Sequence, residues 1–124
     1  MTAYDPNNIF AKILRGEMPA TKVFEDDVAL AFMDIMPRAD GHTLVIPKTP
    51  ARNMFDIAPE ALSGLIQRVQ LVARAAVKGM GAEGASIQQF NESAGGQIVF
   101  HIYFHVLPCW TGVHLWPPGV IVDQ

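Results

Sequence analysis

Cysteine, basic charge and long apolar runs are all scarce in this sequence of 124 residues. The single cysteine, Cys109, has no partner for a disulfide within the chain. No apolar run approaches the roughly 20 residues that a membrane-spanning helix requires, and residues 1–6 lack the pattern of a signal peptide. The nine basic residues are scattered and the net charge is −3, which speaks against a surface for duplex nucleic acid. We therefore expect a soluble cytoplasmic protein without membrane or duplex partners, although a single nucleotide is compatible with this charge.

The apolar content is sufficient for one core. Hydrophobic residues make up 50% of the chain and charged residues 17%, so we predict one domain over residues 1–124. From about residue 109 onward the chain is rich in Trp, Pro and Gly and has no periodic pattern. Because the tryptophans and the leucine in this stretch are too apolar to lie free in water, we expect an irregular but ordered C-terminal arm.

Apolar spacing predicts two helices and about five strands. Residues 9–15 form a short helix between Asn8, a suitable N-cap, and Gly16, a suitable residue just past the end. After Pro59, apolar residues recur at intervals of three and four until Gly79, which predicts one amphipathic helix of roughly 20 residues. Strands are expected at residues 21–25, 28–33, 42–47, 86–90 and 98–106. Together these elements predict an α+β fold in which an antiparallel sheet packs against the long helix.

Two histidines and a tyrosine alternate with apolar residues in the last predicted strand. With a period of two, one side of this strand is apolar and the other carries His101, Tyr103 and His105. The apolar side consists of Ile98, Phe100, Ile102, Phe104 and Val106. On a strand His101 and His105 lie roughly 13 Å apart, which is too far for them to share one metal ion, so no metal site is predicted. We expect the polar row to line a site behind the glycine-rich turn at residues 95–96.

This stretch resembles the signature of the histidine triad (HIT) family, which is His-φ-His-φ-His-φ-φ with φ an apolar residue. The match comprises His101, Ile102, Phe104, His105, Val106 and Leu107. The sequence departs from the signature at Tyr103, where the family has its nucleophilic histidine. Further similar stretches follow in order at residues 9–13, 16–20, 32–35, 41–48, 91–97 and 116–119. The resemblance therefore implies a HIT-like fold over nearly the whole chain.

The resemblance implies a function in purine nucleotide chemistry. HIT enzymes transfer a nucleotidyl group to the middle histidine and then hydrolyse it, and their substrates are nucleoside monophosphates joined to an amine, a sulfate or a nucleotide. A purine nucleoside monophosphate or its conjugate is therefore the expected ligand. Proteins of this type generally form homodimers through the long helix and the strand beside it, with Trp116 directed toward the partner's site. Bacterial members often have zinc-binding cysteines where this chain has Asn8 and Ala11, so zinc and other cofactors are not expected.

The resemblance also implies roles for individual side chains. His101 and His105 would polarise the phosphate and assist the leaving group, and His42 would hold them in place. Asp34 would accept hydrogen bonds from the ribose hydroxyls. The base would lie against Phe10, Phe32 and Ile35, and the phosphate against Asn91, Gly96, Gln97 and the peptide N–H of Ile98. Each residue also has an ordinary structural alternative, such as a half-buried strand histidine, a turn cap or a core phenylalanine.

Tyr103 leaves three functions open. A phenol with a pKa of about 10 is mostly protonated near neutral pH, whereas the imidazole that the family has there is largely a free base. The first function is a nucleotide-binding protein with little hydrolase activity. The second is an altered enzyme in which Tyr103, deprotonated by His101 or His105, carries the nucleotidyl group, or in which water attacks directly. The third is a protein-interaction module with a vestigial pocket, which we favour less because Asp34 and both histidines are retained.

Overall fold

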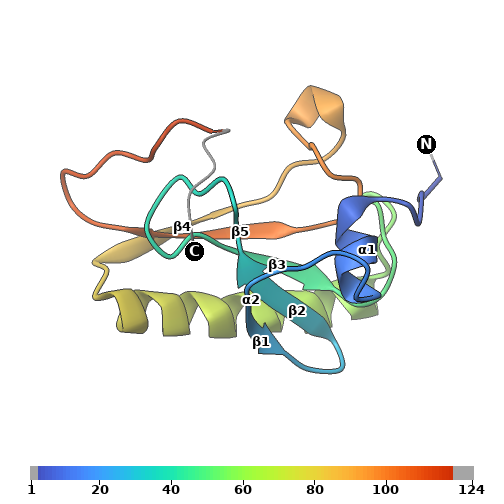
Figure 1. Ribbon diagram of the computed structural model, residues 1–124, viewed down its shortest axis with the longest axis horizontal. Coiled ribbons are helices and arrows are strands. Elements are labelled where there is room, and N and C mark those ends of the chain that lie inside the picture. Colours follow the sequence, from blue (N-terminus) through green and yellow to red (C-terminus); the bar gives the residue numbers. More distant parts are fainter. Residues whose placement is uncertain (1–2, 119–124) are drawn as a thin grey trace.

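The computed structural model describes residues 3–118, which form one five-stranded sheet with two α-helices (Figure 1). In chain order the elements are α1 (Ile9–Leu14), β1 (Lys22–Glu25), β2 (Ala29–Met33), β3 (Thr43–Pro47), α2 (Pro59–Met80), β4 (Gly84–Gln88), the 3₁₀ turn η1 (Ser93–Gly95) and β5 (Phe104–Cys109). The strands lie in the order β1-β2-β3-β5-β4, and every neighbouring pair is antiparallel. The predicted α+β class and its antiparallel sheet are therefore confirmed.

The sheet has an apolar cluster on each face because the side chains of its central strands alternate between the two faces. In β2, Ala29 and Ala31 pack on the side of α2, whereas Leu30 and Phe32 pack on the side of α1. The cluster beside α2, which runs along one face of the sheet in Figure 1, also contains Val45, Leu65, Val69, Val72, Ile102, Phe104 and Val106. The cluster beside α1 also contains Phe10, Ile13, Leu44, Ile46 and Tyr103. The predicted alternation of Tyr103 with its apolar neighbours is thus confirmed.

The last strand is shorter than the sequence pattern predicted. It begins at Phe104 rather than at residue 98, and Ile98 is 76% exposed instead of lying on the apolar side. Gly96, which follows the 3₁₀ turn η1, has a positive φ of 97°. Gln97 and Ile102 then hydrogen-bond to residues 51–53 rather than to a neighbouring strand. The prediction of a strand at residues 98–102 is therefore wrong, because this segment is a loop held by the chain that follows β3.

Both predicted helices form, with the expected start signals, but α2 runs past Gly79, where the sequence pattern placed its end. The side-chain oxygen of Asn8 caps α1 by accepting a hydrogen bond from the Ala11 N–H at 2.9 Å. Helix α2 begins at Pro59 and ends before Gly81, which has a left-handed φ of 62°. Among residues 3–118, no helix combines the length and the apolar character that crossing a bilayer requires.

The C-terminal arm folds back onto the loop that precedes β3. The Trp116 N–H donates to the Arg38 carbonyl oxygen at 2.6 Å, and Arg38 Nε donates to the Trp116 carbonyl oxygen at 3.0 Å. Trp110 Nε1 donates to the Gly81 carbonyl oxygen at 3.0 Å. Residues 110–118 form neither helix nor strand, and the rest of the predicted arm, residues 119–124, lies outside the described residues.

Candidate functional site

Three polar side chains meet at one end of strands β2, β3 and β5. Asp34 follows the last residue of β2, His42 precedes the first residue of β3, and His105 lies in β5 opposite Leu44. Antiparallel pairing places the end of one strand beside the start of the next, which brings these positions together. His42 Nε2 lies 2.9 Å from His105 Nδ1 and 3.5 Å from Asp34 Oδ2. The structure thus groups three of the predicted site residues.

A backbone donor fixes the protons of the two histidines. The Arg38 N–H donates to His42 Nδ1 at 3.0 Å, so we assign the proton of the neutral His42 ring to Nε2. That proton is directed at His105 Nδ1, which places the His105 proton on Nε2. His105 Nε2 is buried and has no hydrogen-bond partner among the described residues. Because an unpaired buried donor costs about 1–3 kcal/mol, this N–H is a candidate contact for a ligand oxygen.

Burial keeps both histidines uncharged. It lowers the pKa of His105 to about 4. Repulsion from His42, when that ring is protonated, lowers the pKa as well, whereas the carboxylate of Asp34 raises it. Burial also lowers the pKa of His42, again against the attraction of Asp34. Both imidazoles are therefore neutral near neutral pH, in agreement with the proton positions that the hydrogen bonds require.

The same three residues approach the geometry of a metal site but do not fit one. One ligand atom from each of Asp34, His42 and His105 lies within 4.8 Å of the others. A metal ion at His42 Nε2 would need the lone pair of that atom, whereas the Arg38 N–H at Nδ1 holds the ring proton on Nε2. The hydrogen bonding of His42 therefore opposes a metal ion at this position.

His101 lies apart from this group. Its ring is fully buried, and its two nitrogens bond the hydroxyl of Tyr4 at 2.7 Å and the carbonyl oxygen of Pro47 at 2.8 Å. Because a carbonyl oxygen can only accept, His101 carries its proton on Nε2 and Tyr4 donates to Nδ1. Burial lowers the pKa of His101, which stabilises this neutral form. The predicted row of three polar side chains on one strand is therefore not formed, since His101 precedes β5 and both of its nitrogens are bonded to other segments.

Tyr103 is the centre of an aromatic group beside His105. Its side chain is only 7% exposed, and its ring centre lies 4.9 Å from that of Phe10 and 5.1 Å from that of His105. Phe10 in turn contacts Phe32 edge-on at 5.5 Å. The Tyr103 hydroxyl accepts a hydrogen bond from the Ile98 N–H at 3.4 Å. Burial raises the pKa of Tyr103 and the nearby backbone N–H groups oppose this only in part, so the phenol is neutral near neutral pH.

The residues predicted to contact a base differ in exposure. Phe10 and Phe32 are 7% and 4% exposed and belong to the apolar cluster beside α1, whereas Ile35 is 53% exposed. Trp116 is 40% exposed and bonds Arg38 of its own chain through the backbone. The two phenylalanines therefore pack in the cluster beside α1, and their contact with a base stays a prediction. Ile35 offers apolar surface next to Asp34.

The side-chain amide of Gln97 donates two hydrogen bonds and accepts two. Its amide nitrogen donates to the carbonyl oxygens of Arg52 at 2.7 Å and Val99 at 2.9 Å. Its oxygen accepts from the Glu92 N–H at 2.8 Å and from Asn53 Nδ2 at 3.1 Å. The side chain is 3% exposed. Gln97 therefore shapes the loop between β4 and β5, and a ligand would have to break these bonds to reach its amide group.

The other polar positions of this loop are also bonded internally. The Asn91 oxygen accepts from the Met54 N–H at 2.8 Å, and its nitrogen donates to the Gln89 side-chain oxygen at 2.9 Å. The Gly96 N–H donates to the Ser93 carbonyl oxygen at 3.0 Å. The structure thus places Asn91, Gly96 and Gln97 near one another but uses their hydrogen bonds to hold the loop.

Glu92 is a residue of this loop that the sequence pattern did not indicate. Its φ of 62° and ψ of 162° are ordinarily adopted by glycine, so its backbone is strained. Arg52 holds its carboxylate with two hydrogen bonds, from Nε at 2.8 Å and Nη2 at 2.9 Å, and Asn53 donates to the same group. These contacts lower the pKa of Glu92 to about 2, with the Arg52 hydrogen bond as the largest cause. The ion pair thus keeps the strained turn in place.

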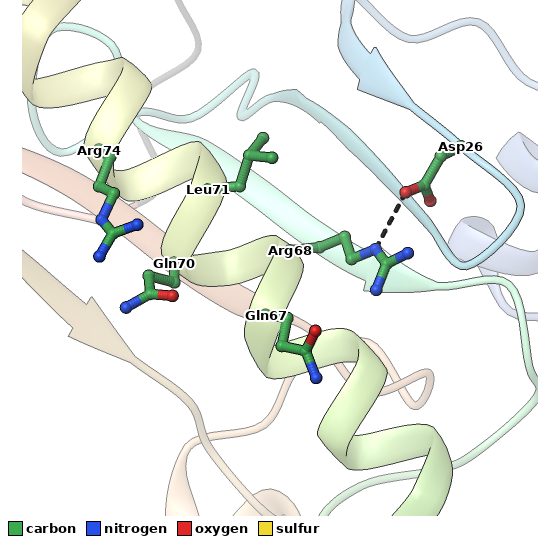
Figure 2. Close-up of a pocket in the computed structure, with 6 residues that line it drawn as sticks. All are labelled: Asp26, Gln67, Arg68, Gln70, Leu71 and Arg74. Carbon is green, nitrogen blue, oxygen red and sulfur yellow. Dashed lines mark hydrogen bonds and ion pairs between the residues drawn. The ribbon is translucent and has the colours of Figure 1, made fainter.

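Two surface hollows lie away from the histidines. Figure 2 shows the larger, of about 520 Å³, where Asp26 of the β1–β2 turn forms an ion pair at 2.9 Å with Arg68 of α2. Its other lining residues, Gln67, Gln70, Leu71 and Arg74, also come from α2. The smaller hollow, of about 170 Å³, lies between the C-terminal arm, the end of β5 and residues 39–40. Neither is lined by Asp34, His42 or His105.

Comparisons with known proteins consistently find one family. The family model described as "HIT domain" matches residues 15–111. The chain is 35% identical over 108 residues to the adenylylsulfatase HINT3 of Arabidopsis thaliana, an alignment that covers 87% of this chain but only 55% of that protein. It is 37% identical to the adenosine 5'-monophosphoramidase hnt1 of Schizosaccharomyces pombe, over 81% of this chain and 72% of that one. The crystal structure of a Hit-like protein from Bartonella henselae superimposes with a TM-score of 0.95 at 49% identity, covering 99% and 90% of the two chains.

We expect His105 to titrate near pH 4 in the folded protein. In the unfolded chain the pKa of this imidazole is about 6.5, so between about pH 4 and pH 6.5 the unfolded chain binds more protons than the folded protein. The stability that neutral His105 confers is therefore lost as the pH falls from about 6.5 to about 4. NMR of the labelled imidazole measures the midpoint. Asp34→Asn should lower the midpoint further because the carboxylate of Asp34 raises the pKa, whereas Asp27→Asn, on the exposed β1–β2 turn, should leave it unchanged. A midpoint above pH 6 would contradict the assigned neutral network.

Proposed function

The chain belongs to the HIT family, and from this premise we propose that it binds purine nucleotides, chiefly through their nucleoside part, at the site of Asp34, His42 and His105. The observation that carries the proposal is the chain of hydrogen bonds from Arg38 through His42 to His105, because it ends in a buried N–H without a partner. A ligand oxygen would satisfy that donor. The similarity to an adenylylsulfatase and to an adenosine 5'-monophosphoramidase supports a nucleotide as the ligand.

Asp34 is the proposed contact for the ribose. Its side chain is 16% exposed, and its Oδ2 lies 3.5 Å from His42 Nε2. An ionised carboxylate accepts hydrogen bonds at both of its oxygens, which suits a pair of ribose hydroxyls, and Oδ1 also accepts from the Met36 N–H at 2.9 Å. The exposed side chain of Ile35 next to it offers apolar surface for the base. These features support a nucleoside site at the end of β2.

Tyr103 is proposed to stand where the family has its nucleophilic histidine, and its surroundings favour binding over covalent catalysis. Burial raises the pKa of the phenol, so little phenolate is available to attack a phosphate. Neither histidine is a suitable base, because the pKa of His105 is about 4 and both nitrogens of His101 are already bonded. We therefore favour a nucleotide-binding protein with little hydrolase activity over an enzyme that forms a nucleotidyl-tyrosine.

Asp34→Ala is expected to weaken adenosine and AMP to a similar degree. Hydrogen bonds to a charged group contribute about 1.5–3 kcal/mol, which corresponds to a loss of roughly tenfold to a hundredfold in affinity. Isothermal titration calorimetry measures both ligands. Asp34→Asn keeps an oxygen that accepts from the Met36 N–H, so it separates loss of the ribose contact from loss of the local turn that this hydrogen bond holds. Asp27→Ala is the matched surface control. Unchanged affinity in both Asp34 variants would overturn the assignment of the ribose contact.

Tyr103→His is expected to create or greatly raise hydrolysis of an adenosine phosphoramidate. The change restores an imidazole at the proposed position of attack while leaving Asp34 and His105 in place, and positioning is most of what such a site supplies. Release of the amine measures turnover in wild type, Tyr103→His and Tyr103→Phe. Activity in wild type that disappears in the Phe variant would instead show that the phenol takes part. A folded, nucleotide-binding His variant without activity would refute the claim that only the nucleophile is missing.

We also propose that the chain forms a homodimer. Strand β4 lies at one edge of the sheet and exposes Ile87, 44% of which is accessible, and α2 exposes Ile66 at 45% and Leu71 at 48%. Apolar side chains exposed on an edge strand and on a long helix are surface that self-association would cover. Light scattering at micromolar concentration should give twice the monomer mass, and Ile87→Lys should shift it toward the monomer, whereas Val23→Lys on the opposite edge strand should not. A monomeric wild type would remove the proposal.

A further inference from the structure

Two successive peptide N–H groups of the loop before β5 are directed at the hydroxyl of Tyr103. The Ile98 N–H donates to this oxygen at 3.4 Å. A hydrogen bond from the Val99 backbone also lowers the pKa of the phenol. The preceding amides are already used inside the loop, since those of Gly95 and Gln97 both donate to the Glu92 carbonyl oxygen, at 2.9 and 3.0 Å. The donors that the loop turns inward therefore converge on one phenol oxygen.

Consecutive backbone N–H groups that converge on one point form a concavity suited to an anion. The His105 ring, which carries the unpartnered Nε2–H, contacts the Tyr103 ring at 5.1 Å between centres. In this chain a neutral hydroxyl, rather than an anion, accepts from the backbone N–H groups of the loop.

The phenol is held firmly in this place. The Tyr103 side chain is 7% exposed, and its ring packs edge-on against Phe10, which itself contacts Phe32. A ligand phosphate would have to displace the hydroxyl and, with it, a ring that belongs to the apolar cluster beside α1. Removing a buried aromatic ring from such a cluster is costly, so displacement is disfavoured.

We infer that Tyr103 determines which class of ligand this site binds. Its hydroxyl takes the place of a phosphate oxygen at the Ile98 and Val99 N–H groups. The site therefore prefers a nucleoside with an uncharged 5′ substituent over a nucleoside phosphate. The inference rests on the proposed nucleoside site at Asp34 and specifies its ligand. The remaining donor for a phosphate is His105 Nε2–H, on a neutral ring beside the carboxylate of Asp34. A dianionic phosphate therefore gains little attraction and meets a nearby negative charge.

The test compares adenosine, AMP and inorganic phosphate by calorimetry in wild type and Tyr103→Phe. We expect wild type to bind AMP no more tightly than adenosine, within a factor of about three, and not to bind phosphate. Tyr103→Phe keeps the ring and frees the two N–H groups, so it should raise the affinity for AMP relative to adenosine by about tenfold. Tyr4→Phe, which removes the half-buried phenol hydroxyl that donates to His101, should leave the ratio unchanged.

Each outcome separates the inference from the proposed function. A wild type that prefers AMP by tenfold or more, or a Phe variant with an unchanged ratio, overturns the role of Tyr103 while leaving a nucleotide site intact. Absence of binding by both adenosine and AMP in wild type overturns the proposed function and the inference with it. NMR of wild type gives a check that needs no variant: AMP and adenosine should shift the Ile98 amide resonance equally, whereas a much larger shift with AMP would contradict the occupied N–H.

Discussion

The hydrogen bond between His42 and His105 is the interaction on which the rest of the site depends. Its direction is set by the Arg38 N–H, which occupies His42 Nδ1 and so places the remaining protons. The loop that returns Arg38 to His42 requires a left-handed residue at Gly41, with φ of 77°, and a Cβ there would lie 2.8 Å from Met80 Cγ. Arg38 also holds the C-terminal arm. One short loop thus fixes the protons of the site and anchors the arm.

Burial then makes the network electrically neutral. The pKa values of His42, His101 and His105 are all lowered, chiefly by desolvation, and that of Tyr103 is raised for the same reason. A neutral imidazole can donate one hydrogen bond to a ligand but cannot attract a dianion through charge. The carboxylate of Asp34 lies on the same side. The site is therefore suited to hydroxyl and carbonyl groups more than to phosphate. This agrees with the position of the Tyr103 hydroxyl, which accepts from backbone N–H groups of the loop before β5.

The sequence predicted those features that depend on near neighbours. Apolar spacing predicted α2 and the alternation of Phe104 and Val106 with Tyr103. The family resemblance selected Asp34, His42 and His105 among the candidate site residues, and the structure shows that these three lie together. Prediction from the sequence failed where a distant segment supplies the hydrogen bonds. His101 bonds Tyr4, 97 positions away, and residues 98–102 are held by residues 51–53 rather than by a strand. A local period cannot indicate which segment lies opposite a buried polar group, so the strand and the row of three side chains were predicted wrongly.

The strain at Glu92 bears on whether the loop before β5 has a shape of its own. A residue other than glycine keeps a φ of 62° only where its contacts hold the backbone in that conformation. Here Arg52 and Asn53 bind the carboxylate of Glu92, and the Gln97 side chain accepts from the Glu92 N–H. None of these contacts involves Tyr103, whose hydroxyl contacts the loop further along, at the Ile98 N–H. The turn at residues 92–97 therefore has supports of its own, and we expect it to persist when the hydroxyl is lost. This independence is the reason that a change confined to Tyr103 can alter which ligands bind without altering the site that holds them.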